Sequence, residues 1–114
     1  MRKIPPKLRD EMSKDSYYKK CCITNLPGNI EWHHNLIFGG KQVNEKFCIL
    51  PLNKEIHRNI VKYKEQCDWI MLNRATDEEL KKYSKVINYL ELKKKLNQKY
   101  GLYQNGNTGK IINE

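Results

Sequence analysis

The sequence predicts an α+β fold in which two short strands pack against the helix that follows them. Two apolar runs, 30–34 and 47–50, have the length of short strands and are separated by a loop that contains Gly39-Gly40. A helical period of apolar residues begins after Asn53. Because two strands are not stable alone, that helix must cover them. We therefore expect a strand–strand–helix unit, with further helices on either side of it.

The other elements follow from local signals. Pro6 suits the first turn of a helical arm over 7–20. The stretch 22–29 is dense in turn residues and leads into the first strand. Pro51 is expected to end the second strand.

Capping residues predict where the later helices begin and end. Asn53 is a good N-cap for the helix from Lys54. Thr76 followed by Glu79 is a capping box, so a last helix is expected over 77–100, with a glycine stop at position 101. One apolar stripe of this last helix is formed by Leu80, Tyr83, Ile87 and Leu90, and a second apolar edge by Val86, Tyr89, Leu96 and Tyr100.

The length of 114 residues predicts a single domain over 1–114. Its core is expected at about 20–72, and the Gly- and Asn-rich stretch 101–114 is expected to be a loose tail. The stripes of the last helix favour packing within the chain. Because that helix is long for so small a protein, a homodimer formed through it is kept as a hypothesis.

The charge balance favours a polyanionic partner. The 22 Lys and Arg against 13 Asp and Glu give a formal net charge of +9, and each neutralised phosphate releases a counterion. No apolar run approaches the roughly 20 residues that span a bilayer, and no apolar region follows the basic N-terminus as in a signal peptide. These features exclude membrane and secreted classes, so we expect a cytoplasmic protein with reduced thiols.

The cysteines favour burial over cross-linking. A disulfide between the adjacent Cys21 and Cys22 would strain the backbone. Cys48 and Cys67 are expected to be small core residues, and a four-cysteine zinc site is not expected. A zinc site that uses Cys22, Cys48 and some other ligand stays open.

All three histidines fall on elements that the predicted fold brings together. His33 and His34 end the first strand, and His57 lies in the first turns of the helix after the second strand. One histidine from each segment can therefore reach a shared metal ion, while the second of the adjacent pair takes a proton from water. A single histidine is more often structural, but three in this arrangement favour a site. Strict strand alternation directs His33 and His34 to opposite faces, so a shared site needs the strand to kink or end there.

The segments 31–34, 39–40 and 49–58 together resemble the HNH endonucleases. The resemblance covers about residues 7–62 and is greatest to small phage and mobile-element nucleases. It implies a ββα-metal (His-Me finger) core, with an N-terminal helical arm and a C-terminal helical extension. It also implies a DNA endonuclease that acts in the cytoplasm of a bacterial or phage-infected cell.

The resemblance also implies the roles of single residues. His33 matches the first metal ligand, His57 the ligand on the helix, and His34 the general base. The catalytic Asn that usually stands nine positions before the helix ligand is Cys48 in this sequence. In the family this Asn braces the loop and orients the base. Its candidate replacements here are Asn44 and Asn53.

Two protein ligands leave room for phosphate and water on the metal ion, which suits Mg²⁺ or Mn²⁺, whereas imidazole ligands would also accept Zn²⁺ or Ni²⁺. Val61 stands four residues after His57, where some family members have a further ligand. Lys41, Lys46 and Arg58 flank the metal residues and are predicted to contact the phosphates of double-stranded DNA. The alternative for these three cations is an ordinary solvated surface.

We thus expect a metal-dependent endonuclease that nicks DNA. An alternative, supported by Cys48, is a catalytically weak HNH-like module that binds nucleic acid or a protein partner and regulates. A third interpretation is a small basic DNA-binding domain whose histidines hold a structural metal ion.

Overall fold

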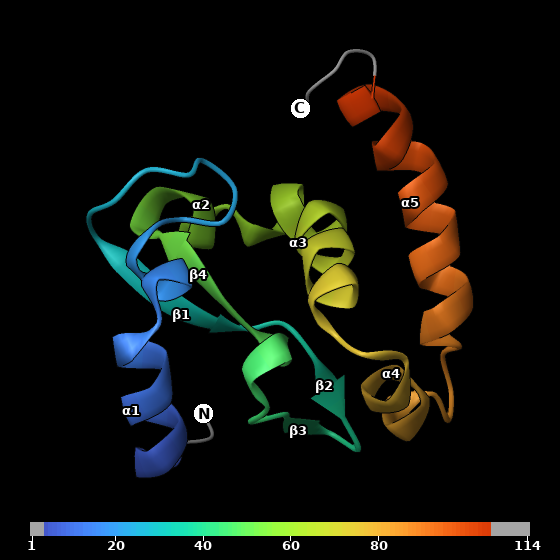
Figure 1. Cartoon of the computed structure of the whole chain (residues 1–114), viewed down its shortest axis with the longest axis horizontal. Coiled ribbons are helices and arrows are strands. Elements are labelled where there is room, and N and C mark those ends of the chain that lie inside the picture. Colours follow the sequence, from blue (N-terminus) through green and yellow to red (C-terminus); the bar gives the residue numbers. More distant parts are fainter. Residues whose placement is uncertain (1–3, 106–114) are drawn as a thin grey trace. The chain divides into compact units, whose positions relative to one another are not determined.

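The computed structural model describes residues 4–105, and they form two compact units that meet in sequence between Arg74 and Ala75. The helices are α1 (Pro6–Lys14), α2 (Lys54–Arg58), α3 (Ile60–Arg74), α4 (Asp77–Tyr83) and α5 (Tyr89–Asn105) (Figure 1). The strands are β1 (Ile30–His34), β2 (Ile37–Phe38), β3 (Lys41–Gln42) and β4 (Ile49–Asn53), and two 3-10 helices are η1 (Ser16–Lys19) and η2 (Lys46–Cys48). The α+β class is confirmed. A single domain over 1–114 stays a prediction, and 106–114 of the predicted tail lies outside the described residues.

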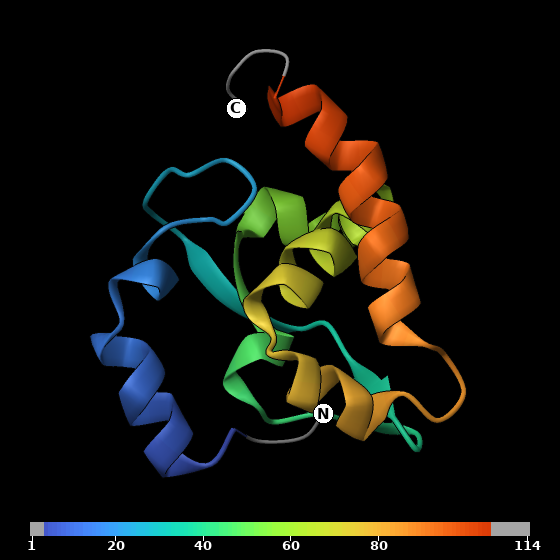
Figure 2. The same cartoon turned by 45° about the vertical axis from the view of Figure 1, so that its right-hand side comes forward.

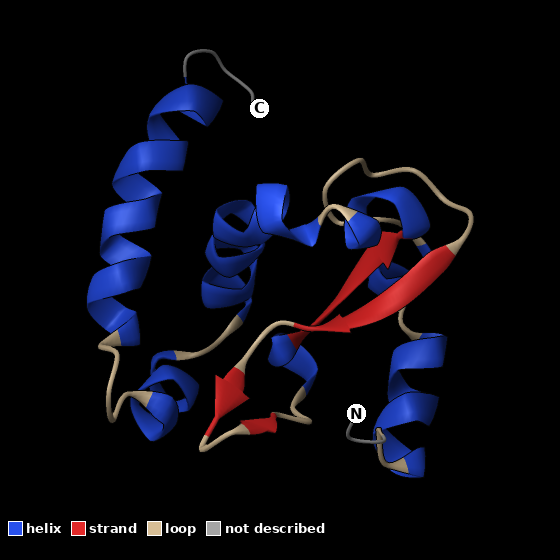
Figure 3. Cartoon of the chain, turned by 180° about the vertical axis from the view of Figure 1, so that it is seen from behind, coloured by secondary structure: helices blue, strands red, loops and turns tan. Residues whose placement is uncertain are grey.

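The main sheet is formed by β1 and β4. They pair antiparallel, from Ile30 opposite Asn53 to His34 opposite Ile49 (Figure 3). The prediction of β1 is confirmed at both ends. The prediction that Pro51 ends the second strand is wrong, because Pro51 lies inside β4. A proline is tolerated there because the sheet has only two strands, and every strand is therefore an edge strand.

A short hairpin occupies the region expected to be one long loop. β2 and β3 pair antiparallel on either side of Gly39 and Gly40 (Figure 3). Both glycines have positive φ, +61° and +77°, which two-residue hairpin turns require and which glycine adopts without strain. Each strand has two residues, too few to show an alternating apolar pattern. The hairpin could therefore not be read from hydrophobic periodicity.

Helical segments lie on both faces of the β1–β4 sheet (Figures 1 and 2). On one face, Trp32 packs on a cluster that includes Met12 of α1, Tyr18 of η1 and Ile49 of β4. On the other face lie α2, which follows β4 without a loop, and then α3. Successive residues of a strand point to opposite faces, so β1 presents alternate side chains to two different surroundings.

The helix predicted after Asn53 is two helices. The Asn53 cap is confirmed, since its side chain accepts a hydrogen bond from the N–H of Ile56 at 2.8 Å. The chain leaves the α-helical conformation at Asn59, whose side-chain amide donates to the carbonyl of Glu55 at 2.9 Å. Asparagine competes in this way for backbone groups and weakens a helix. The result is a five-residue α2 that carries His57 and a separate α3.

The second unit also has two helices where one is predicted. The capping box of Thr76 and Glu79 is confirmed. The helix over 77–100 is interrupted because the Ser84 hydroxyl donates to the carbonyl of Leu80 at 2.6 Å and accepts from the N–H of Tyr89 at 3.2 Å. A serine bound in this way ends α4 and braces the start of α5.

This interruption changes the apolar stripes of the last helix. Val86 and Ile87 lie in the connection between α4 and α5, where they are 97% and 50% exposed, so they do not belong to a buried face. Leu80 and Leu96 are buried as predicted. Gly101 does not stop the helix, because α5 extends to Asn105.

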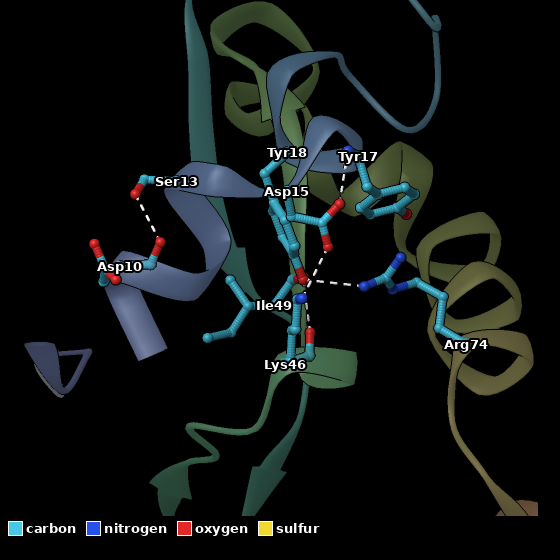
Figure 4. A network of polar contacts seen from close by, with 8 residues as sticks. All are labelled: Asp10, Ser13, Asp15, Tyr17, Tyr18, Lys46, Ile49 and Arg74. Carbon is cyan, nitrogen blue, oxygen red and sulfur yellow. Dashed lines mark hydrogen bonds and ion pairs between the residues drawn. The ribbon is translucent and has the colours of Figure 1, made fainter. Parts of the chain in front are cut away.

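A buried polar network joins the 3-10 helix η1 to β4 and α3. The hydroxyl of Tyr18 lies 2.7 Å from the carbonyl oxygen of Lys46 and 2.9 Å from that of Ile49, and donates to them (Figure 4). The same hydroxyl accepts a hydrogen bond from the guanidinium of Arg74 at 3.1 Å. Tyr18 thus satisfies two backbone carbonyl groups, and one of them belongs to Ile49, the residue of β4 that pairs with His34.

We expect Tyr18→Phe to lower the free energy of unfolding by about 1–3 kcal/mol, because it leaves buried polar groups without their partner. Urea denaturation measures this loss. Tyr17→Phe is the matched control, since the Tyr17 hydroxyl is buried with no hydrogen-bond partner except the weakly bonding thiol of Cys22. Tyr17→Phe should lower the free energy of unfolding much less than Tyr18→Phe does. Equal losses in the two variants would contradict the role given to the Tyr18 hydroxyl.

Candidate active site

The fold brings two of the three histidines together. His33 of β1 and His57 of α2 face each other with ring centroids 5.1 Å apart and ring planes at 66°. They meet because α2 follows β4 directly and β4 pairs with β1. Glu31 lies on the same face of β1 as His33, and its carboxylate oxygen Oε1 is 2.8 Å from Nδ1 of His57. This juxtaposition is the one that the sequence predicts for the metal ligands.

A buried chain of polar groups holds the ring of His33. Its Nε2 lies 3.1 Å from Oδ1 of Asn35, a side chain that is only 5% exposed. The Asn35 amide donates in turn to Oδ1 of Asp68 at 2.9 Å, and Asp68 also accepts from Lys64. Because an amide oxygen only accepts, Nε2 of His33 carries the hydrogen and Nδ1 keeps its lone pair.

Burial lowers the pKa of His33 to about 4, and the nearby positive charges of His57 and Lys64 act in the same direction. The imidazole is therefore neutral at pH 7, the form in which histidine binds metal ions. The hydrogen bond to Asn35 opposes this shift but does not cancel it.

This low pKa predicts how stability depends on pH in the metal-free protein. The unfolded chain protonates His33 near pH 6.5 and the folded chain only near 4, so stability falls as the pH drops through this interval. In EDTA, we expect a melting temperature several degrees lower at pH 5 than at pH 7.5. His33→Gln should reduce this difference. Asp15 does not interfere, because its pKa is lowered from 3.8 and its contribution is lost only at more acidic pH.

The third histidine lies on the opposite face of β1. Regular pairing continues to His34 opposite Ile49, so the strand does not kink, and alternation separates His34 from His33. Nε2 of His34 is 2.7 Å from Oδ1 of Asn44. By the same reasoning Nε2 carries the hydrogen, and Nδ1 is left with a lone pair that can accept a proton.

Asn44 and Asn53, the two candidate replacements for the missing Asn, make different contacts. Asn44 contacts His34, whereas Asn53 is committed to the cap of α2. Cys48 is fully buried, and its carbonyl accepts a hydrogen bond from the N–H of Asn35 at 2.8 Å. The structure thus places the Cys48 thiol in the core, and Asn44 contacts the ring of His34.

The cysteines contribute no cluster of metal ligands. Cys21, Cys48 and Cys67 are fully buried, which confirms Cys48 and Cys67 as core residues, and the four cysteines are not joined by disulfides. Within residues 4–105, no group of three or more His, Cys, Asp or Glu side chains could hold a metal ion.

The three predicted DNA-contacting cations differ in their surroundings. Lys41 is exposed on β3, and Arg58 is exposed beside His57, 3.6 Å from the carboxylate of Glu55. Lys46 instead pairs with Asp15 at 2.8 Å, next to the Tyr18 network (Figure 4). Lys41 and Arg58 are therefore better placed than Lys46 to bind an external phosphate.

The chemistry of the paired histidines fits a divalent ion. Metal-binding histidines usually donate their second ring N–H to an oxygen acceptor, which fixes the ring and its tautomer. His57 has Glu31 in this position and His33 has Asn35, so one ring nitrogen of each is left as a ligand. Val61, at the position where some HNH endonucleases have a further ligand, is an exposed apolar residue and adds no ligand.

The residues that support these two rings were not predicted from the sequence. Glu31 could have been found, because it stands two residues before His33 on a predicted strand and must share its face. No local pattern indicates that Asn35 and Asp68 support His33, since these two residues are 33 positions apart in sequence and meet only in the folded chain.

Comparison of the chain with protein-family models, curated proteins and solved structures finds no match. Within the described residues, no helix is long and apolar enough to cross a membrane. The functional assignment therefore rests on the residues and contacts described above.

Proposed function

We propose that this chain is a metal-dependent endonuclease of the HNH type, with a ββα-metal core made of β1, β4 and α2. The observation that carries the proposal is the pairing of His33 and His57, 5.1 Å apart, next to a third histidine held by Asn44. Nucleic acid is the substrate that a net charge of +9 favours, and DNA is the form that the resemblance implies. The location that goes with this function is the cytoplasm of a bacterial or phage-infected cell.

The roles of the residues follow from their free ring nitrogens. His33 and His57 would hold a divalent ion, Mg²⁺ or Mn²⁺ by preference and Zn²⁺ or Ni²⁺ as alternatives. When bound, such an ion polarises the phosphate and stabilises the leaving oxygen. His34 takes the proton of the attacking water on Nδ1, because its Nε2 is engaged by Asn44. Arg58 and Lys41 hold neighbouring phosphates.

The opposite orientations of His33 and His34 define how the substrate lies. Their Cα atoms are about 3.8 Å apart, and their side chains point to opposite faces of β1, an edge strand of the two-stranded sheet. A phosphodiester that crosses the edge of β1 at this point meets the metal-binding face on one side and the base on the other. One such site cuts one strand, so a monomer nicks, and cutting both strands requires a homodimer or a second encounter.

The experiment is nicking of supercoiled plasmid at low salt with Mg²⁺, Mn²⁺, Zn²⁺ or Ni²⁺, with EDTA as control. We expect nicked circles with at least one of these ions and none with EDTA. If the protein binds DNA but no ion supports nicking, the nuclease proposal is wrong.

That second outcome would favour a module that binds nucleic acid or a protein and regulates without cutting. The observation on its side is the buried Cys48 in place of the usual Asn. A purely structural metal ion on the histidines would instead show as a loss of stability on chelation, without any effect on DNA binding.

A further inference from the structure

A groove lies on the same face of β1 as His34. It has a volume of about 390 Å³ and is lined by Met12, Ser13, Tyr18, Lys19, Ile30 and Trp32. Along β1, Ile30, Trp32 and His34 alternate with the residues that face α2, so the groove and the imidazole share one face. The volume is in the range of small-ligand sites.

The aromatic ring of Trp32 lines this groove and is held in place by packing. Its ring meets the ring of Tyr18 edge to face, with centroids 6.1 Å apart, and it packs on the core cluster that contains Met12 and Ile49. Tyr18 is itself fixed by its hydrogen bonds to backbone carbonyls (Figure 4). Trp32 is nevertheless only half-buried, so part of its ring is open to a ligand.

Charge favours an anionic strand in this position. The exposed Lys19 lines the groove, where its Nζ donates to the carbonyl of Ser13 at 3.0 Å, and Lys20 is exposed next to it. Both belong to a chain with nine more formal positive charges than negative ones. An aromatic side chain with a lysine beside it is the arrangement that binds unpaired nucleotides, since a base stacks on the ring and a phosphate pairs with the cation.

The spacing connects this groove to the proposed cleavage site. Trp32 and His34 are two residues apart on a strand, so their Cα atoms are separated by roughly 6.6 Å. This is close to the distance between neighbouring nucleotides in an extended strand, which suits one base at Trp32 and the adjacent phosphate at His34.

We propose that the groove binds an unpaired nucleobase of the strand that is cut, stacked against Trp32. The inference rests on the proposed function for the identity of the strand, and it defines the substrate class as single-stranded or locally unpaired nucleic acid. A fully paired duplex cannot place a base on Trp32 without breaking its stacking in the helix.

The experiment uses intrinsic fluorescence, because the chain has two tryptophans, Trp32 and Trp69. The Trp69→Phe protein, in which Trp32 is the only reporter, is titrated in EDTA with an unpaired oligothymidylate, a hairpin duplex of equal charge and polyglutamate. We expect quenching by the oligothymidylate at concentrations at least tenfold lower than by the duplex, and none by polyglutamate. The mirror variant Trp32→Phe, which keeps Trp69, should show no quenching.

Binding is measured in parallel by anisotropy of a labelled oligothymidylate. Trp32→Leu and Lys19→Glu should each weaken binding roughly tenfold or more, while Trp32→Phe should retain most of it. Lys19→Glu keeps the test valid if Trp32→Leu does not fold. The inference is overturned if saturating oligothymidylate leaves Trp32 fluorescence unchanged, or if polyglutamate quenches it equally. Since no metal is present, quenching without any nicking activity would refute the proposed function and leave this inference standing.

Discussion

Replacing His34 with alanine is expected to lower the rate of plasmid nicking by at least 100-fold, while affinity for metal ions and for DNA changes little. General-base catalysis contributes about 10²–10⁴-fold to a rate. His34 lies on the face of β1 opposite to His33 and donates to Asn44, so its removal leaves the paired histidines and their partners intact. Initial rates of nicking, with metal and DNA binding measured on the same preparations, test this expectation.

Asn44→Ala is the informative companion to this variant. In the proposed mechanism Asn44 orients the ring of His34, so its loss should lower the nicking rate about 10-fold to 100-fold, less than the loss of His34 itself. In the double variant the Asn44 effect should disappear, because no imidazole remains to be oriented. Additive losses would contradict the orienting role.

Replacing His57 with alanine is expected to abolish metal-dependent nicking and to weaken binding of Mn²⁺ by at least tenfold. His57 is one of the two proposed ligands, and within residues 4–105 no group of three or more His, Cys, Asp or Glu side chains could hold a metal ion. The affinity for Mn²⁺ therefore depends on both imidazoles. Calorimetric titration of the metal-free protein with Mn²⁺ measures the change.

Arg58→Ala is the matched control, because Arg58 is the neighbour of His57 on α2 and its exposed side chain contacts only Glu55 among the charged groups of the described residues. It should leave Mn²⁺ binding unchanged and weaken DNA binding. If His57→Ala binds Mn²⁺ as tightly as the wild type does, the metal site lies elsewhere.

The parts of the fold that the sequence predicts are those decided by local chemistry. The bounds of β1, the Asn53 cap and the Thr76–Glu79 capping box are set by neighbouring residues and are confirmed. The two divided helices were not predicted because side chains bind nearby backbone. Asn59 and Ser84 each divide a helix whose apolar period continues past them.

In the candidate site, too, some contacts could be predicted from the sequence and others could not. The approach of His33 to His57 could be predicted, because it follows from strand pairing and from a helix that begins directly after β4. Strict alternation predicts that the side chains of His33 and His34 point to opposite faces, and the straight course of β1 confirms it. The proposed site therefore requires a phosphodiester that crosses the edge of β1 and meets both side chains. The support of His33 by Asn35 and Asp68 depends on how α3 packs, which no local pattern encodes.

The most direct test of the central proposal is chemical rescue of His34→Ala by imidazole in the plasmid-nicking assay. Wild type and variant are purified in parallel and assayed with the ion that best supports nicking. The account predicts that wild type nicks, that the variant does not, and that added imidazole restores nicking by the variant without accelerating the wild type. A variant that nicks at the wild-type rate without imidazole, or that imidazole fails to restore, would contradict the assignment of His34 as the general base.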